Sequence, residues 1–245
     1  MAVAFFGITQ DQQHLISPTF TAASVVNSAS YAAGTAAPGG IMSLFGVGFG
    51  SNWATAAAGP ASTLAGVKIN VGGVSAPLFY ASPSQLSFQM PYEASGATTL
   101  TLTREDGKTT TVNLNVGDAQ PGLFTSDASG AGPAAATLAD SSLLTSTNPA
   151  TRGNVVVLYA TGLGKVTPGA VTGAGATGPA TCVNPVTVTI AGRTVTPDYA
   201  GLTPGYPGLY QVNVRIPADL SQTGNVPVKV TAAGVDSNSV IIALR

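Results

Sequence analysis

Few side chains in this chain could carry out catalysis. Its one histidine is His14, its one cysteine is Cys182, and its two glutamates are Glu93 and Glu105. Nucleophilic catalysis of the Ser-His-acid type needs a base, and His14 lies outside the repeated region of the chain. Glycoside hydrolysis needs two carboxylates across a cleft, whereas several of the eight aspartates lie in turn contexts such as Asp106-Gly107. The sequence therefore predicts a protein that is not an enzyme and uses no cofactor.

Metal and thiol chemistry are equally poorly supported. No Asp-x-Asp-x-Asp spacing of a calcium loop occurs, so no metal site is expected. With one cysteine there is no intramolecular disulfide, and Cys182 has no adjacent histidine that would activate it. We expect Cys182 to be a small, buried or half-buried hydrophobic side chain.

Two aromatic side chains are candidates for glycan contact. Trp53 lies in an expected loop, and Tyr206 lies in a segment rich in Pro and Gly. Tyr80, Tyr199 and Tyr210 are instead expected in the core or at turns, because they occupy repeat-equivalent or strand-edge positions. Glycan binding is therefore kept as an alternative function.

A long loop rich in Gly, Thr and Pro spans residues 168–185. The chain has no Asn-x-Ser/Thr acceptor, so a covalent glycan would be O-linked. Threonines interleaved with Pro and Gly in and beside this loop suit that modification, although a plain flexible loop explains them equally. The candidate positions are Thr167, Thr172, Thr177 and Thr181.

The charge and hydropathy patterns argue against two kinds of interaction, which are nucleic-acid binding and insertion of a helix into a membrane. Only 8% of residues are charged, the net charge is −1, and the nine basic residues are scattered. A surface that follows nucleic-acid phosphates is therefore not expected. No apolar stretch approaches the roughly 20 residues of a membrane helix, and the N-terminus is not a recognisable signal peptide.

The elements that would position these side chains occur twice in the chain. Residues 39–50 are repeated at 153–164, residues 67–73 at 186–192, and residues 85–91 at 211–217. The order is kept while the offset grows from 114 to 126 residues, which indicates duplication of a whole domain of about a hundred residues. Both copies alternate apolar and polar residues, and turn signals such as Gly72-Gly73 and Asp106-Gly107 separate the expected strands.

The sequence predicts an all-β fold with two tandem Ig-like β-sandwich domains and an extended N-terminal arm. We assign residues 1–21 to the arm, 22–120 to the first domain and 121–245 to the second, which includes most of a connector at 117–150.

The chain also resembles a known family of modules. The similarity is carried by residues 24–31, 37–46 and 76–91, and it continues through residues 148–153, 159–164 and 204–213. These motifs resemble a module common at the C-termini of secreted acidobacterial (Solibacter-type) proteins. The resemblance implies Ig-like sandwiches and an extracellular or cell-surface location. That family has no assigned catalytic activity, so it transfers no site residues.

The N-terminal arm has no counterpart before the second repeat, and it is rich in apolar residues. Ig-like sheets have open edges to which an extended segment can add as a strand. We therefore expect a structural subunit of an extracellular filament, with the chain itself as partner, assembled head to tail through this arm. The alternative is a monomeric cell-surface module for carbohydrate binding or adhesion. The expected donor residues are Ala2, Val3, Ala4, Phe5, Phe6, Ile8, Leu15, Ile16 and Phe20.

Overall fold

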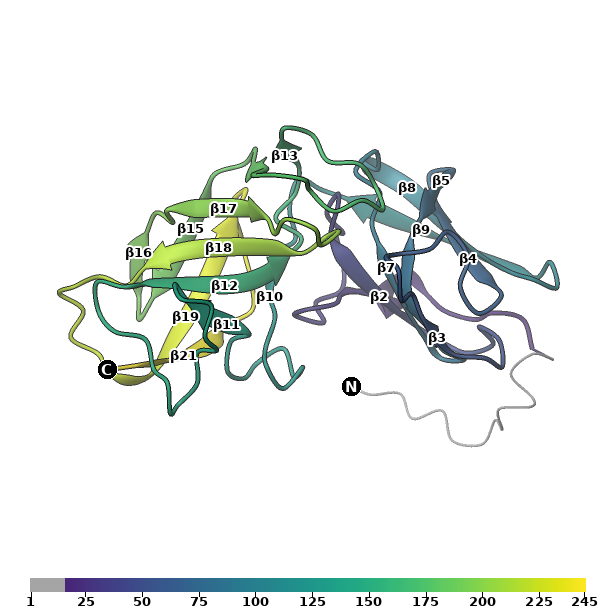
Figure 1. The fold of residues 1–245 in the computed structure, drawn as a ribbon. Coiled ribbons are helices and arrows are strands. Elements are labelled where there is room, and N and C mark those ends of the chain that lie inside the picture. Colours follow the sequence, from purple (N-terminus) through teal and green to yellow (C-terminus); the bar gives the residue numbers. More distant parts are fainter. Residues whose placement is uncertain (1–15) are drawn as a thin grey trace.

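A computed structural model describes residues 16–245 of the protein. The donor positions expected from Ala2 to Ile8, Leu15 and the sole histidine lie outside the described residues. Residues 16–245 form two β-sandwiches side by side (Figure 1). The prediction of an all-β fold with tandem Ig-like sandwiches is confirmed. The one helical element in this range is the three-residue 3₁₀ turn η2 (Ala22–Ser24), so no described helix could cross a membrane.

The first sandwich packs a five-stranded sheet, in the order β1-β2-β7-β6-β3, against a four-stranded sheet, in the order β5-β4-β8-β9. All pairs are antiparallel. The strands are β1 (Val25–Asn27), β2 (Ile41–Phe45), β3 (Ala54–Thr55), β4 (Val67–Val71), β5 (Val74–Ala76), β6 (Leu78–Ala81), β7 (Gln85–Gln89), β8 (Gly96–Arg104) and β9 (Thr109–Val116).

The second sandwich repeats this plan. One sheet has the order β10-β12-β18-β17-β14-β13, with β11 also paired to β12, and the other has the order β16-β15-β19-β20, with β21 also paired to β19. The strands are β10 (Gly122–Leu123), β11 (Ala136–Leu138), β12 (Val155–Thr161), β13 (Val166–Thr167), β14 (Thr181–Cys182), β15 (Val186–Ile190), β16 (Arg193–Val195), β17 (Tyr199–Leu202), β18 (Tyr210–Arg215), β19 (Gly224–Ala232), β20 (Val235–Asp236) and β21 (Val240–Leu244).

The duplication seen in the sequence extends to strand pairing. Ile41 of β2 pairs with Gln89 of β7, as Val155 of β12 pairs with Arg215 of β18. The pair β4–β8 corresponds to β15–β19 in the same way. The larger sheet has five strands in the first sandwich and seven in the second. A further difference lies at the end of each repeat. The single strand β9 in the first sandwich corresponds to the two strands β20 and β21 in the second.

Each sandwich has its own hydrophobic core, built from alternate strand residues. Val67, Ile69 and Val71 of β4 are buried while Lys68 is exposed, because successive strand side chains point to opposite faces of a sheet. The two expected hairpins occur. Gly72 and Gly73 join β4 to β5 with φ angles of 57° and 83°, a region that residues with a Cβ rarely adopt.

The start of the described chain is attached to the first sandwich. Thr19 exchanges backbone hydrogen bonds of 2.9 and 3.1 Å with Val47. Phe20 is buried, and its ring meets Phe49 edge-on with centroids 6.0 Å apart. Ile16 and Phe20, two of the expected donor residues, therefore lie against their own sandwich.

Candidate functional site

The two sandwiches meet at a polar joint centred on Thr161, which is fully buried. Its hydroxyl accepts a hydrogen bond of 2.7 Å from the backbone N–H of Ile41 in the first sandwich. The same hydroxyl donates to the carbonyl of Gly208 in the second sandwich at 2.9 Å. One side chain therefore ties the start of β2 to a loop of the other domain.

The loop between β13 and β14 reaches across to the first sandwich (Figure 1). The Thr172 hydroxyl accepts from the Tyr92 N–H at 3.0 Å and donates to the Glu93 carboxylate at 2.8 Å. The N–H of Gly173 donates to the side-chain carbonyl of Gln89 at 2.7 Å. The composition of this loop predicted a flexible or glycosylated segment and gave no sign of these contacts between the two domains.

Tyr92 belongs to the first domain but packs in the hydrophobic core of the second. Only 8% of its surface is exposed, and burial raises the pKa of its hydroxyl to about 12. The neighbouring Tyr210 is fully buried, donates to the Gly164 carbonyl, and has its pKa raised by burial as well. Neither phenol ionises near neutral pH, so both act as packing groups.

Glycines make room at the joint for the Tyr92 ring and for the linker at Gln120. A Cβ on Gly39 would lie 2.1 Å from the Tyr92 ring, and a Cβ on Gly162 would lie 2.1 Å from the Gln120 carbonyl oxygen. Both glycines also have positive φ angles, so larger residues are excluded by space and by backbone conformation. The buried Asn27 completes the joint, since its amide donates to the same Gln120 carbonyl at 2.7 Å.

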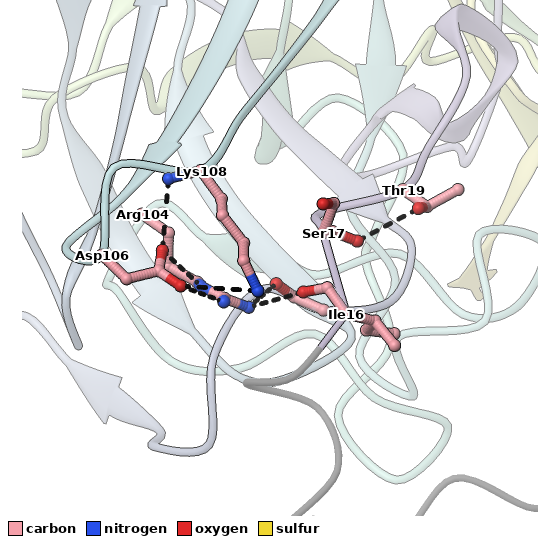
Figure 2. A network of polar contacts seen from close by, with 7 residues as sticks. Ile16, Ser17, Thr19, Arg104, Asp106 and Lys108 are labelled. Carbon is pink, nitrogen blue, oxygen red and sulfur yellow. Dashed lines mark hydrogen bonds and ion pairs between the residues drawn. The ribbon is translucent and has the colours of Figure 1, made fainter.

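A second polar cluster fixes the root of the arm, defined here as residues 16–19 (Figure 2). Arg104 is 4% exposed, and its Nη1 donates to the carbonyls of Ile16 at 3.0 Å and Gly48 at 2.8 Å. Its Nε donates to Asp106 at 3.0 Å, and Nη2 contacts the other oxygen of that carboxylate. These hydrogen bonds hold the pKa of Asp106 well below its usual range.

The two candidate glycan-binding aromatics are strongly exposed but lie far apart. Trp53 is 69% exposed and directly precedes β3, which pairs with the end of β6 next to the turn at Ser82. Tyr206 is 61% exposed in the loop before β18, close to the joint. They therefore do not form one shared platform.

The four candidate threonines are in different environments. Thr167 and Thr181 pair across β13 and β14, and the Thr181 hydroxyl donates to the Thr167 carbonyl at 3.3 Å. Thr172 is committed to the joint by two hydrogen bonds. Thr167, Thr177 and Thr181 are all exposed. A modification would thus be accommodated more easily at Thr167 or Thr177, whose hydroxyls form no hydrogen bond within residues 16–245, than at Thr172.

A cavity of about 650 Å³ lies beside the joint, between the linker at 117–121 and the turn at 233–238. Asp118 and Gln120 line it, and the buried side-chain oxygen of Gln120 has no hydrogen-bond partner within residues 16–245. No group of three or more His, Cys, Asp or Glu side chains that could hold a metal occurs in that range.

No protein-family model matches the sequence, and no curated protein matches it. Among solved structures, the chain is similar to SGBP-B of the Bacteroides ovatus mixed-linkage glucan utilization locus, solved with a mixed-linkage heptasaccharide. The identity is 13% over 86% of this chain and 42% of that chain, with a TM-score of 0.34. A tandem pair of titin Ig domains is 12% identical over 86% of this chain and 90% of that one, with a TM-score of 0.25.

The extracellular region of plexin A4 is 11% identical over 100% of this chain and 17% of that one, with a TM-score of 0.31. The chain thus spans less than half the length of SGBP-B and of the plexin region. These similarities concern the fold alone.

Proposed function

We propose that the protein is a structural subunit of an extracellular filament, assembled head to tail through its N-terminal segment. The observation that supports this proposal is the position of residue 16, where the described part of the chain begins, relative to the two sandwiches. β2 runs from Ile41 at the joint to Phe45, so Gly48 lies at the opposite pole of the first sandwich. Arg104 fixes the root of the arm to Gly48 at that pole. The chain therefore enters the molecule on the side facing away from the second sandwich (Figure 1).

The joint supports the same proposal because it fixes the relative orientation of the two sandwiches. A filament of regular repeat requires subunits of constant shape. Hydrogen bonds from Thr161, Thr172 and Gly173, together with the buried ring of Tyr92, give the pair that constancy.

The test is electron microscopy of the full chain beside a deletion of residues 1–15. The deletion keeps the root of the arm and Phe20, so its melting temperature should stay near that of the full chain. We expect filaments from the full chain and dispersed two-lobed particles from the deletion. Filaments of equal length from both proteins would refute the proposal.

The second candidate is a monomeric cell-surface module for carbohydrate binding or adhesion. It is favoured by the exposed ring of Trp53 and by the cavity beside the joint, which Asp118 and Gln120 line. Retention on immobilised polysaccharides should fall with Trp53→Ala or Tyr206→Ala. Val171→Ala is the matched control, because Val171 is 69% exposed and not aromatic. Equal retention of all three variants would reject this candidate.

An extracellular location also makes O-glycosylation part of the proposal. Intact-mass measurement of the native protein beside Thr177→Ala would show whether Thr177 carries a glycan. If the native protein and Thr177→Ala exceed their polypeptide masses by the same amount, Thr177 is not the modified residue.

A further inference from the structure

The edge strand β9 is long, uncharged and free of proline, which leaves it poorly protected against pairing with another chain. Edge strands are commonly blunted by shortness, charge or proline. The other edges of the first sandwich, β1, β3 and β5, are two or three residues long. β9 spans eight residues, Thr109–Val116, and it contains neither a charged residue nor a proline.

The second sandwich covers the equivalent edge with its own chain. Residues 132–134 run parallel to β21 and pair with it. The N–H of Ala134 donates to the Ile241 carbonyl at 2.8 Å, and the N–H of Ile241 donates to the Gly132 carbonyl at 3.0 Å. The outer edge of β21 is therefore closed at its middle.

In the first sandwich the joint end of the edge is closed, and at the other end the Thr110 hydroxyl donates to the Pro18 carbonyl. Ala36 donates to the Asn115 carbonyl at 2.9 Å and accepts from the Gly117 N–H at 2.9 Å. Ala150 forms the same two contacts at the end of β21. The residue that matches Ile241 is Asn113. Within residues 16–245, no segment beyond β9 bonds to the Asn113 backbone.

Packing differs at the same place. Val112 pairs with Leu100, as Val240 pairs with Val228 in the second sandwich. Val240 is completely buried, whereas Val112 is only partly buried against the first core. A strand lying along β9 would cover that remaining apolar surface. Among residues 16–245, neither a backbone hydrogen-bond partner nor a full hydrophobic cover is found at this point of the edge.

Chain length explains the difference between the two repeats. In the second sandwich, twelve residues connect the paired β10 to β11, and they reach across to β21. In the first, only residues 20–24 connect the Thr19 bridge to β1, and three of them form η2. η2 lies beside β9 but buries none of its own residues. An added strand can therefore displace it at little cost.

We propose that the outer edge of β9, centred on Asn113, accepts residues 2–8 from a second copy of the chain as an additional strand. This inference rests on the proposed filament and identifies its acceptor. Seven extended residues reach about 23 Å, which suffices to follow the open part of β9. Residues 9–15 then provide a linker of up to about the same length before the root of the arm. Alternate apolar residues of the donor lie over Val112.

The test places a proline where it removes a hydrogen-bond donor from the outer edge of β9 only. The backbone groups of Asn113 point to the same side as those of Asn115, whose carbonyl bonds outward to Ala36. Asn113→Pro therefore removes no bond to β8, and its melting temperature should match that of Asn113→Thr. We expect Asn113→Pro to raise the concentration needed for filaments about 5-fold, equivalent to one backbone hydrogen bond, because proline lacks the N–H and keeps its carbonyl. Asn113→Thr should assemble normally.

The outcomes separate the acceptor from the filament itself. Loss of filaments on deleting residues 1–15 but not with Asn113→Pro would overturn the acceptor and leave the filament standing. Filaments from the deletion would overturn both.

A cysteine experiment distinguishes a second copy from the chain's own arm. Copies carrying only Asn113→Cys are mixed with copies carrying only Phe6→Cys or Ala4→Cys, all in a Cys182→Ala background. A disulfide-linked pair of chains supports the proposal. A single chain that carries both cysteines is the control. If cross-links form only within that chain, the proposal is overturned, because the arm then binds its own sandwich in a monomer.

Discussion

Thr161→Val is the sharpest probe of the joint, because valine keeps the shape of threonine but not its hydroxyl. The change removes a donor to Gly208 and an acceptor for the Ile41 N–H. Two hydrogen bonds contribute about 1 kcal/mol each, and a buried N–H without an acceptor costs about 1–3 kcal/mol. We therefore expect the free energy of unfolding to fall by about 3 kcal/mol.

Calorimetry and urea unfolding would measure this loss. For 245 residues that unfold as one unit, about 3 kcal/mol lowers the melting temperature by about 6 °C. The matched control is Thr161→Ser, which keeps the hydroxyl and loses one methyl group at about 1 kcal/mol. If Thr161→Ser proved more damaging than Thr161→Val, packing rather than hydrogen bonding would govern the joint, and the reasoning would fail.

Three further predictions concern the root of the arm and the thiol. Arg104→Met should cost about 3 kcal/mol in urea unfolding, because the carbonyls of Ile16 and Gly48 lose a charged donor; an unchanged midpoint would contradict this. The folded pKa of Asp106 is lowered, so its contribution is present above the unfolded pKa of about 4 and is lost as pH falls through the folded value. Asp106→Asn should therefore lose less stability than the wild type on acidification below about pH 4, and parallel curves would disprove it. Burial raises the pKa of the Cys182 thiol to about 12, so iodoacetamide at pH 8 should label the folded protein at least about 100-fold more slowly than the unfolded chain.

Most of the fold could be predicted from local patterns in the sequence. Alternation in β4 and β15 predicted which residues are buried, and the glycine-containing turns predicted the hairpins, because both signals depend on neighbouring residues. The repeat predicted two equivalent sandwiches. The exposure of Trp53 and Tyr206 also followed from their loop positions.

The joint could not be predicted in the same way. Tyr92 resembles an ordinary residue after a strand, and only the folded chain brings it into the core of the other domain. Thr172 lies in a segment whose composition is typical of a flexible loop, yet both of its hydrogen bonds cross between domains. Contacts between residues about 80 positions apart leave no periodic signal in a single sequence.

Under the proposed assembly, the unequal edges of the two sandwiches determine how many neighbours each subunit can bind. The second sandwich closes its edge at Ile241, whereas within residues 16–245 no segment closes the corresponding edge of the first at Asn113. Under the proposed assembly, each chain then has one donor segment and one acceptor. Two links per subunit permit a linear chain or a closed ring, but no branches. Closing the second edge would thus be a means of controlling topology, because an acceptor on each sandwich would let one subunit bind two donors and turn the linear chain into a branched one.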